Sequence, residues 1–310
     1  MSRVRLTSIY IMMKNYFALL AICLFTSLSS SNLNAQSDYD IYNIFMENPI
    51  KYTVLQEDNE YYLYNKKDNP TCNIKVIFFF PEKTFRLSKY EEIQSLFVAG
   101  FFGEEYKNMS PKDAIKTYIK NNTDAYKQQL EKSGLYKKEE QEVLSRNGDP
   151  SEIHSLFSYE TILRNTIMFN KGNIVSQVIN IYEYAGGAHG SSTTRGLIVD
   201  LHTGTLIKFD DIFFDSVDQQ ISDILLTHLL QKRNLSNKED LYEIGFDFDN
   251  FPLTDNFIID DKGITFIYNQ YELGAFSLGT VEIFVPYWDL LPYMKRTSVI
   301  AKLIRIDKME

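Results

Sequence analysis

Residues 157–184 read FSYETILRNTIMFNKGNIVSQVINIYEY. Two runs rich in β-branched and aromatic residues, 157–169 and 174–184, flank the tetrapeptide Asn170-Lys171-Gly172-Asn173. Such runs predict strands, and Asn and Gly between them suit the tight turn of a hairpin. The stretch therefore predicts a long antiparallel hairpin.

Further strands are predicted on both sides of this hairpin, because apolar and polar residues alternate there. On the N-terminal side the alternation covers 52–56, 61–64 and 71–80, with a turn at Asp58-Asn59; on the C-terminal side it covers 197–201, 257–259, 264–268 and 281–285.

Helical spacing of apolar residues predicts three helices, over 88–103, 110–134 and 216–229. Ser88 and Ser216 each stand three residues before a Glu or Gln and predict capping boxes, whereas Ser110, which a proline follows, predicts an N-cap. Residues 132–150 are charged and lack a clear period, so a frayed helix end and a loop are expected. Because strands and helices come in blocks, we expect the α+β class, with mainly antiparallel sheets and packed helices.

The first 35 residues have the order of a secretory signal peptide. They carry three basic and no acidic residues, an apolar run over 16–25, and the small residue Ala35 at the expected cleavage point. The apolar run is about half the length that a membrane-spanning helix needs. The chain is therefore predicted to be exported, to the periplasm or the outside, without a transmembrane anchor after cleavage.

The two cysteines are not expected to form a structural framework. Cys23 lies in a stretch similar to a lipobox, but Ile22 stands where a small residue is required, which argues against a lipid anchor. Cleavage removes Cys23 and leaves Cys72 without an intramolecular partner. We expect Cys72 to pack in a strand as a small apolar residue.

Composition and charge narrow the functional classes. With 310 residues, 44% of them hydrophobic and 24% charged, the chain has the makeup of a globular protein. Without the leader it has 29 basic against 41 acidic residues, a formal net charge of −12. This balance argues against nucleic-acid binding, which needs a basic footprint. It is compatible with a basic partner, and equally with surface carboxylates that only keep the protein soluble.

Signatures of phosphate, dinucleotide and zinc-protease chemistry are missing from the sequence. It contains no GxGxxG, GxxxxGK[ST], HExxH or GxSxG string. We therefore expect no cofactor and no metal site.

Two other strings are distinctive, namely YEYAGGAHG at 182–190 and YELGAFSLG at 271–279. Their order and spacing resembles the extracytoplasmic domain pair of RsiV-like anti-sigma factors and PdaC-like peptidoglycan deacetylases. The resemblance implies two small α+β domains, a PdaC-like one over 36–190 and an RsiV-like one over 191–310. It also implies that binding is the usual role, since some members bind lysozyme and the chemistry of the deacetylases belongs to a separate domain.

We expect the two strings to form a contact face. Its candidate binding residues are Gly186, Gly187, His189, Ser191, Tyr271, Glu272 and Phe276. Rigid aromatic rings beside small residues give contact area at a low entropic cost. The first hypothesis is thus an exported, non-catalytic binding protein of the cell envelope, whose ligand is another protein, such as a lysozyme-like muramidase, or peptidoglycan.

Two alternatives stay open. One is a cell-wall glycan hydrolase or deacetylase-type enzyme that uses His189 as a general base; the other is an envelope sensor or assembly component, and the oligomeric state is open too. If 174–184 pairs with the strand that follows it, Asp200 and His202 lie on the order of 35 Å from His189. The three residues are then not expected to share one site. His228 is expected at the edge of the core.

Overall fold

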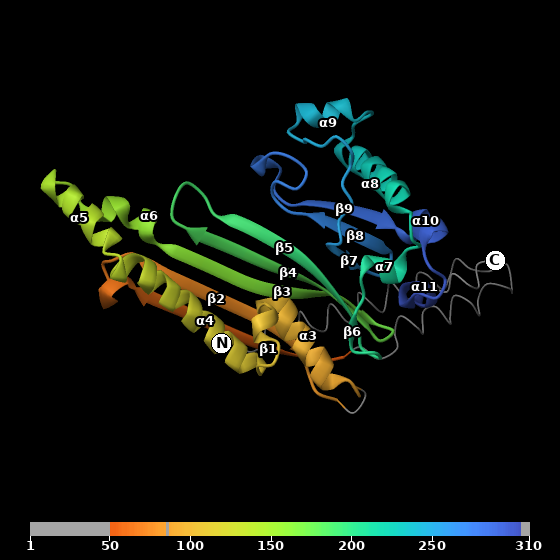
Figure 1. Cartoon of the computed structure of the whole chain (residues 1–310), viewed down its shortest axis with the longest axis horizontal. Helices are drawn as coiled ribbons and strands as arrows, with labels where there is room; N and C mark the ends of the chain where they lie inside the picture. Colours follow the sequence, from red (N-terminus) through yellow and green to blue (C-terminus); the bar gives the residue numbers. More distant parts are fainter. Residues whose placement is uncertain (1–49, 85–86, 305–310) are drawn as a thin grey trace, which may run out of the picture. The chain divides into compact units, whose positions relative to one another are not determined.

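The computed structural model describes residues 50–84 and 87–304. The predicted signal peptide, its cleavage after Ala35, and Cys23 lie outside these residues. Those described belong to one compact unit, with a six-stranded sheet in the order β1 to β6 and a three-stranded sheet in the order β7 to β9 (Figure 1). The α+β class predicted from the sequence is confirmed.

The strands of the larger sheet are β1 (Tyr52–Tyr62), β2 (Thr71–Pro81), β3 (Tyr159–Lys171), β4 (Ile174–Ala185), β5 (Ser191–Asp200) and β6 (Thr205–Leu206). The smaller sheet consists of β7 (Phe257–Ile259), β8 (Gly263–Tyr268) and β9 (Val281–Pro286). The main helices are α3 (Tyr90–Phe102), α4 (Pro111–Lys127), α5 (Leu135–Ser145) and α8 (Asp218–Arg233). Short helices are α6 (His154–Phe157), α7 (Phe209–Ile212), α9 (Glu239–Glu243), α10 (Tyr287–Leu290) and α11 (Val299–Leu303).

The predicted hairpin forms the centre of the larger sheet as β3 and β4. The two strands pair antiparallel up to Lys171 and Ile174, so that Gly172 and Asn173 make the turn. Both have positive φ, 59° and 61°, as a two-residue hairpin turn of this twist requires. The pair β2–β3 is parallel, an arrangement that needs a long connection, and here the connection contains α3, α4 and α5.

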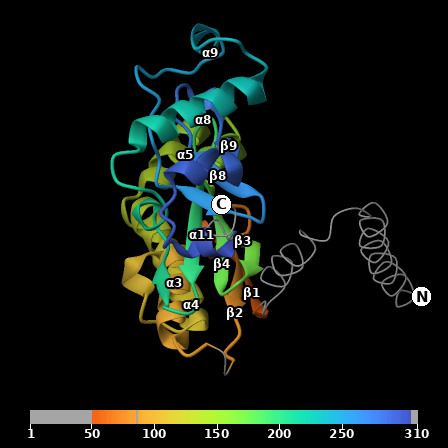
Figure 2. The ribbon, with the colours of Figure 1, turned by 90° about the vertical axis from the view of Figure 1, so that its right-hand side faces the viewer.

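One face of the larger sheet is covered by α3 and α4 (Figures 1 and 2). Alternate residues of β2 point into this layer, and Phe78 stacks on Phe101 of α3 with ring centroids 4.2 Å apart. Tyr126 of α4 is buried and donates a hydrogen bond to the Phe157 carbonyl at 2.9 Å. Burial raises the pKa of Tyr126, so its hydroxyl stays a neutral donor.

The opposite face of β4 and β5 carries the smaller sheet. Ser176 is buried there, and its hydroxyl accepts a hydrogen bond from the backbone N–H of Ile259 in β7 at 3.0 Å. Gly196 of β5 allows a close approach, since a Cβ at this position would lie 2.0 Å from the Phe257 carbonyl oxygen. Strand β5 thus contacts both sheets, and the domain division proposed at residue 190 stays a prediction.

Three local expectations are wrong. No turn interrupts 52–62, because Asp58 and Asn59 continue the pairing of β1 with β2. The charged stretch 132–150 contains the helix α5, which the burial of Tyr136 and Val143 holds against the core. The capping boxes also fail: α3 begins at Tyr90 and α8 at Asp218, and neither helix has a side-chain cap.

The expectations for Ser110 and Cys72 are confirmed. Ser110 accepts a hydrogen bond from the N–H of Asp113 and caps α4, with Pro111 in the first turn. Cys72 is buried in β2, and burial raises the pKa of its thiol to about 11, so it stays protonated. No helix within 50–84 and 87–304 is long and apolar enough to cross a membrane.

Candidate functional site

The two distinctive strings meet in space. The first forms the loop between β4 and β5, and the second connects β8 to β9 and includes a short 3₁₀ helix, Phe276–Leu278. The imidazole of His189 stacks on the ring of Phe276, with centroids 4.2 Å apart and planes 28° from parallel. Tyr271 lies 5.6 Å from Phe276 on the same surface. We call these three rings the aromatic face.

The His189 loop is fixed to the neighbouring backbone. Gly186 has φ +81°, and a Cβ there would lie 2.1 Å from the Leu156 carbonyl oxygen. The hydroxyl of Tyr184 is placed to donate to the carbonyl oxygens of Ser155 and Gly187, both at 2.9 Å. This loop therefore needs glycine at 186, and its contacts with the neighbouring backbone fix the position of His189.

Side-chain amides dock the second string on the free edge of β5. Asn269 accepts from the N–H of Thr194 at 2.7 Å and donates to its carbonyl at 3.1 Å. The side-chain amide of Asn256 bonds the same edge of β5. It accepts from the N–H of Gly196 at 2.7 Å and donates to the Thr194 carbonyl at 2.8 Å. Gln270 accepts from the N–H of Ser192 at 3.1 Å and the hydroxyl of Ser191 at 3.3 Å.

These amides replace the hydrogen bonds that a further strand would make. β6 pairs with β5 only at Val199 and Asp200, so the rest of the edge would otherwise be open. The docking fixes the second string beside the first. Asn269 and Gln270 directly precede the second string and are not among the candidate binding residues, because their partners are backbone groups more than 70 residues away and no local pattern points to them.

Hydrogen bonds within and just before the second string also stabilise its conformation. The Glu272 carboxylate accepts from the N–H of Asn269 at 2.8 Å, and the buried Tyr268 donates to the Pro252 carbonyl at 2.7 Å. Burial, with a smaller contribution from Glu272, raises the pKa of Tyr268 and keeps it a donor. Tyr271 has φ +71° and is 72% exposed, which turns its ring outward.

The structure separates His189 from Asp200 and His202, as the hairpin geometry requires. The β4–β5 register runs from Glu183↔Ser191 beside His189 to Ile174↔Asp200 at the other end. The buried Asp200 carboxylate accepts from the backbone N–H groups of His202 and Thr203, so it closes a turn. The described contacts of His189 are its ring stack and a 3.2 Å contact with the Gly190 carbonyl, and neither involves a carboxylate.

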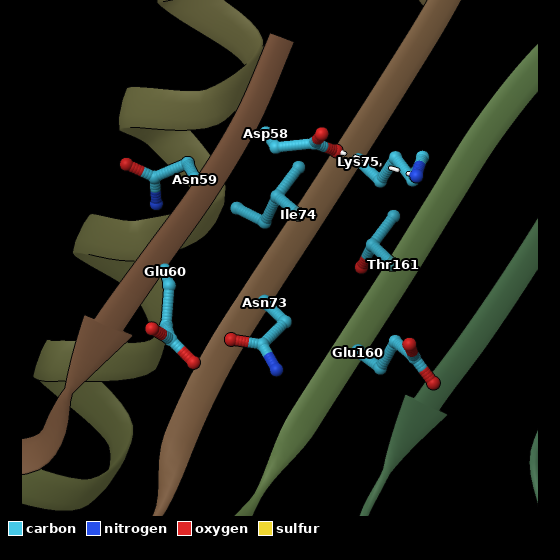
Figure 3. Close-up of a pocket in the computed structure, with 8 residues that line it drawn as sticks. All are labelled: Asp58, Asn59, Glu60, Asn73, Ile74, Lys75, Glu160 and Thr161. Atoms are coloured by element: carbon cyan, nitrogen blue, oxygen red, sulfur yellow. Dashed lines mark ion pairs between the residues drawn. The ribbon is translucent and has the colours of Figure 1, made fainter. Parts of the chain in front are cut away.

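A hollow on the larger sheet has a different character (Figure 3). It has a volume of about 230 Å³ and is lined by Asp58, Asn59, Glu60, Asn73, Ile74, Lys75, Glu160 and Thr161. Its charges include an exposed ion pair between Lys75 and Asp58 at 3.8 Å. The lining has no aromatic ring, and an exposed pair of this kind contributes little to stability. This hollow is best explained as a solvated sheet face.

Among the residues that the structure places, no group of three or more His, Cys, Asp or Glu could hold a metal ion. The seven candidate residues divide by role. Gly186 and Glu272 shape their loops, and Ser191 contacts Gln270. Gly187 has φ +93° and accepts a hydrogen bond from Tyr184 through its carbonyl oxygen, while a Cβ at this position would meet no atom within 4 Å. His189, Tyr271 and Phe276 provide the outward surface.

Comparison with known families agrees with the resemblance seen in the sequence. A family model described as "Deacetylase PdaC" matches residues 101–192, and one described as "Protein of unknown function (DUF3298)" matches residues 210–288. The chain thus carries a PdaC-like segment followed by a DUF3298 segment, and the predicted pairing is confirmed. The His189 loop lies in the first match and the second string in the other.

Solved structures support the same relation. A member of the DUF3298 family from Bacteroides fragilis is 27% identical, with a TM-score of 0.73 over 82% of this chain and 97% of that chain. A DUF3298 family protein from Pseudomonas aeruginosa is 14% identical, with a TM-score of 0.51 over 81% of this chain and 96% of that chain, and shows the fold alone. None of the curated proteins matches the chain.

Proposed function

We propose that this chain is an exported binding protein of the cell envelope, which holds a basic partner protein on the aromatic face. The stack of His189 on Phe276 carries the proposal, because it joins two loops that are distant in sequence into one surface. Rings that are already ordered before binding lose little conformational freedom, so such a surface suits the anchor of a protein interface.

Carboxylates beside the aromatic face favour a basic partner. Glu272 is exposed within the second string, and the exposed Asp247 donates its backbone N–H to the Leu273 carbonyl of that string. The whole chain has a formal net charge of −9. Complementary charge raises the rate of association and discriminates against acidic partners.

A lysozyme-like muramidase is the first partner to test, since it is basic and the resemblance implies that some related proteins bind lysozyme. Titration of the purified protein with lysozyme in a calorimeter should give saturable heat, with weaker binding at high salt. Heat that is absent at both low and high salt would exclude this partner. Equal binding at both salts would exclude the electrostatic part of the proposal.

Replacement of the exposed ring on this face should reduce the affinity for lysozyme strongly. We expect Tyr271→Asn to weaken binding at least tenfold, because a ring at the centre of an interface contributes about 2 kcal/mol or more. Asn tolerates the positive φ of this position, so the melting temperature should not change. Trp288→Ala is the matched control, since Trp288 is also an exposed aromatic residue but lies on α10, outside the aromatic face. Similar losses in both variants would contradict the assignment.

A further inference from the structure

A groove outside the aromatic face has the composition of a saccharide site. It lies between α8 and the segment of α10 that continues to Tyr293, and its volume is about 610 Å³. This volume is within the range of about 300–1,000 Å³ that is typical of small-ligand sites. The residues lining it are Gln220, Asp223, Ile224, Thr227, His228, Gln231, Trp288, Asp289, Pro292 and Tyr293.

One face of α8 supplies the polar wall. Its lining residues recur at intervals of three and four along the helix, and so lie on one stripe. The apolar residues Ile221, Leu225 and Leu229 occupy the other face and are fully buried. The helix is therefore fixed by its core side, while its polar stripe stays open to a ligand.

Trp288 supplies an apolar platform on the opposite wall. Its side chain is 69% exposed, although a tryptophan ring is among the side chains that gain most from burial. Within 50–84 and 87–304, no ring contact of Trp288 is described. An exposed indole beside hydroxyl and amide groups suits the C–H face of a pyranose ring, which stacks on it while the sugar hydroxyls reach the polar wall.

The polar groups are arranged to bind hydroxyls. His228 and Asp289 hold each other through a 2.9 Å contact between Nε2 and Oδ2, which orients the carboxylate across the groove. Asp223 is exposed and accepts from Gln219 at 2.8 Å, with further lone pairs free on the carboxylate. The side-chain amides of Gln220 and Gln231 make no hydrogen bond among the described residues, so they are available to a ligand.

The charge of the groove selects among sugars. Two carboxylates line it, and no Lys or Arg does. An acidic sugar would therefore be repelled, whereas a neutral or amino sugar would be accepted. We infer that this groove binds a neutral or amino oligosaccharide, at a site separate from the aromatic face.

The chain offers a direct probe, because Trp288 is its only tryptophan. Its fluorescence should change saturably on titration with tri-N-acetylchitotriose, and also with the deacetylated trimer. Trigalacturonate should give no change. A lack of response to both chitin-derived trimers, or an equal response to trigalacturonate, would overturn the proposal. So would a lack of saccharide response combined with loss of lysozyme binding in Trp288→Ala by calorimetry, since the groove would then be a protein contact.

Variants separate this groove from the aromatic face. By calorimetry, Trp288→Ala should weaken binding of the acetylated trimer at least tenfold, and Tyr271→Asn should leave it unchanged. Asp223→Lys, at an exposed position, should weaken the deacetylated trimer more than the acetylated one. Unchanged melting temperatures would show that the variants fold. Binding that persists in Trp288→Ala, or is lost equally in Tyr271→Asn, would refute the inferred site.

Discussion

Asn165→Leu should destabilise the protein by about 3–5 kcal/mol, because Asn165 completes the ladder between β2 and β3 with its side chain. The paired residues of this parallel ladder end at Ile77 and Arg164. Beyond them the Asn165 amide takes over, accepting from the Phe79 N–H at 2.7 Å and donating to the Phe79 carbonyl at 2.9 Å. It also donates to Gln177 at 2.5 Å.

The size of this effect follows from burial. Asn165 is 1% exposed and Gln177 is fully buried, so water cannot replace the lost hydrogen bonds. Each buried polar group that loses its partner costs about 1–3 kcal/mol, and three groups lose theirs. Urea denaturation measures the change. Asn250→Leu at an exposed position should change the stability by about 0.5 kcal/mol or less. If the unfolding free energies of the two variants differ by less than about 1 kcal/mol, the Asn165 amide does not stabilise the end of the β2–β3 ladder.

The fold was most predictable where the signal is local. The turn at Gly172 and Asn173 could be predicted because two adjacent positive φ angles restrict the residue types. The helix α5 could not, since its sequence is mostly charged and its position depends on burying Tyr136 and Val143 against distant elements. Ser216 has φ +66° and does not cap α8, because the N-cap position is occupied by Val217.

The two strings that form the aromatic face could be recognised in the sequence, but their contact in space could not. His189 and Phe276 each belong to a recognisable string, but no local sequence pattern predicts that their rings stack. The stack depends on the amides of Asn256 and Asn269 reaching the edge of β5, a contact between residues that are 60 or more positions apart. The groove at Trp288 was not predicted at all, because His228 was assigned to the core edge by its helical spacing alone.

Gly274→Ala should both destabilise the protein and disorganise the aromatic face. Gly274 has φ +148°, and a Cβ there would lie 2.3 Å from the Gly245 carbonyl oxygen and 2.8 Å from the Phe246 Cα. All of the nearest atoms belong to backbone, which cannot rotate away as a side chain could. The second string must therefore move away from the 245–247 segment, with an expected loss of about 2–4 kcal/mol.

Gly279→Ala is the control for Gly274→Ala, because it introduces backbone strain without a steric clash. Gly279 also has a positive φ, +65°, but a Cβ there would meet no atom within 4 Å. With ψ −152° its backbone lies in a region that essentially only glycine occupies, so its substitution should cost about 1–3 kcal/mol from backbone strain alone. Hydrogen exchange gives the local readout, since Ala275 and Asp247 donate their N–H groups to Gly245 and Leu273, both at 2.9 Å. These two amides should exchange much faster in Gly274→Ala and little faster in Gly279→Ala. Equal exchange in both variants would mean that the second string does not need the 245–247 contact, and that the aromatic face is held by the β5 edge alone.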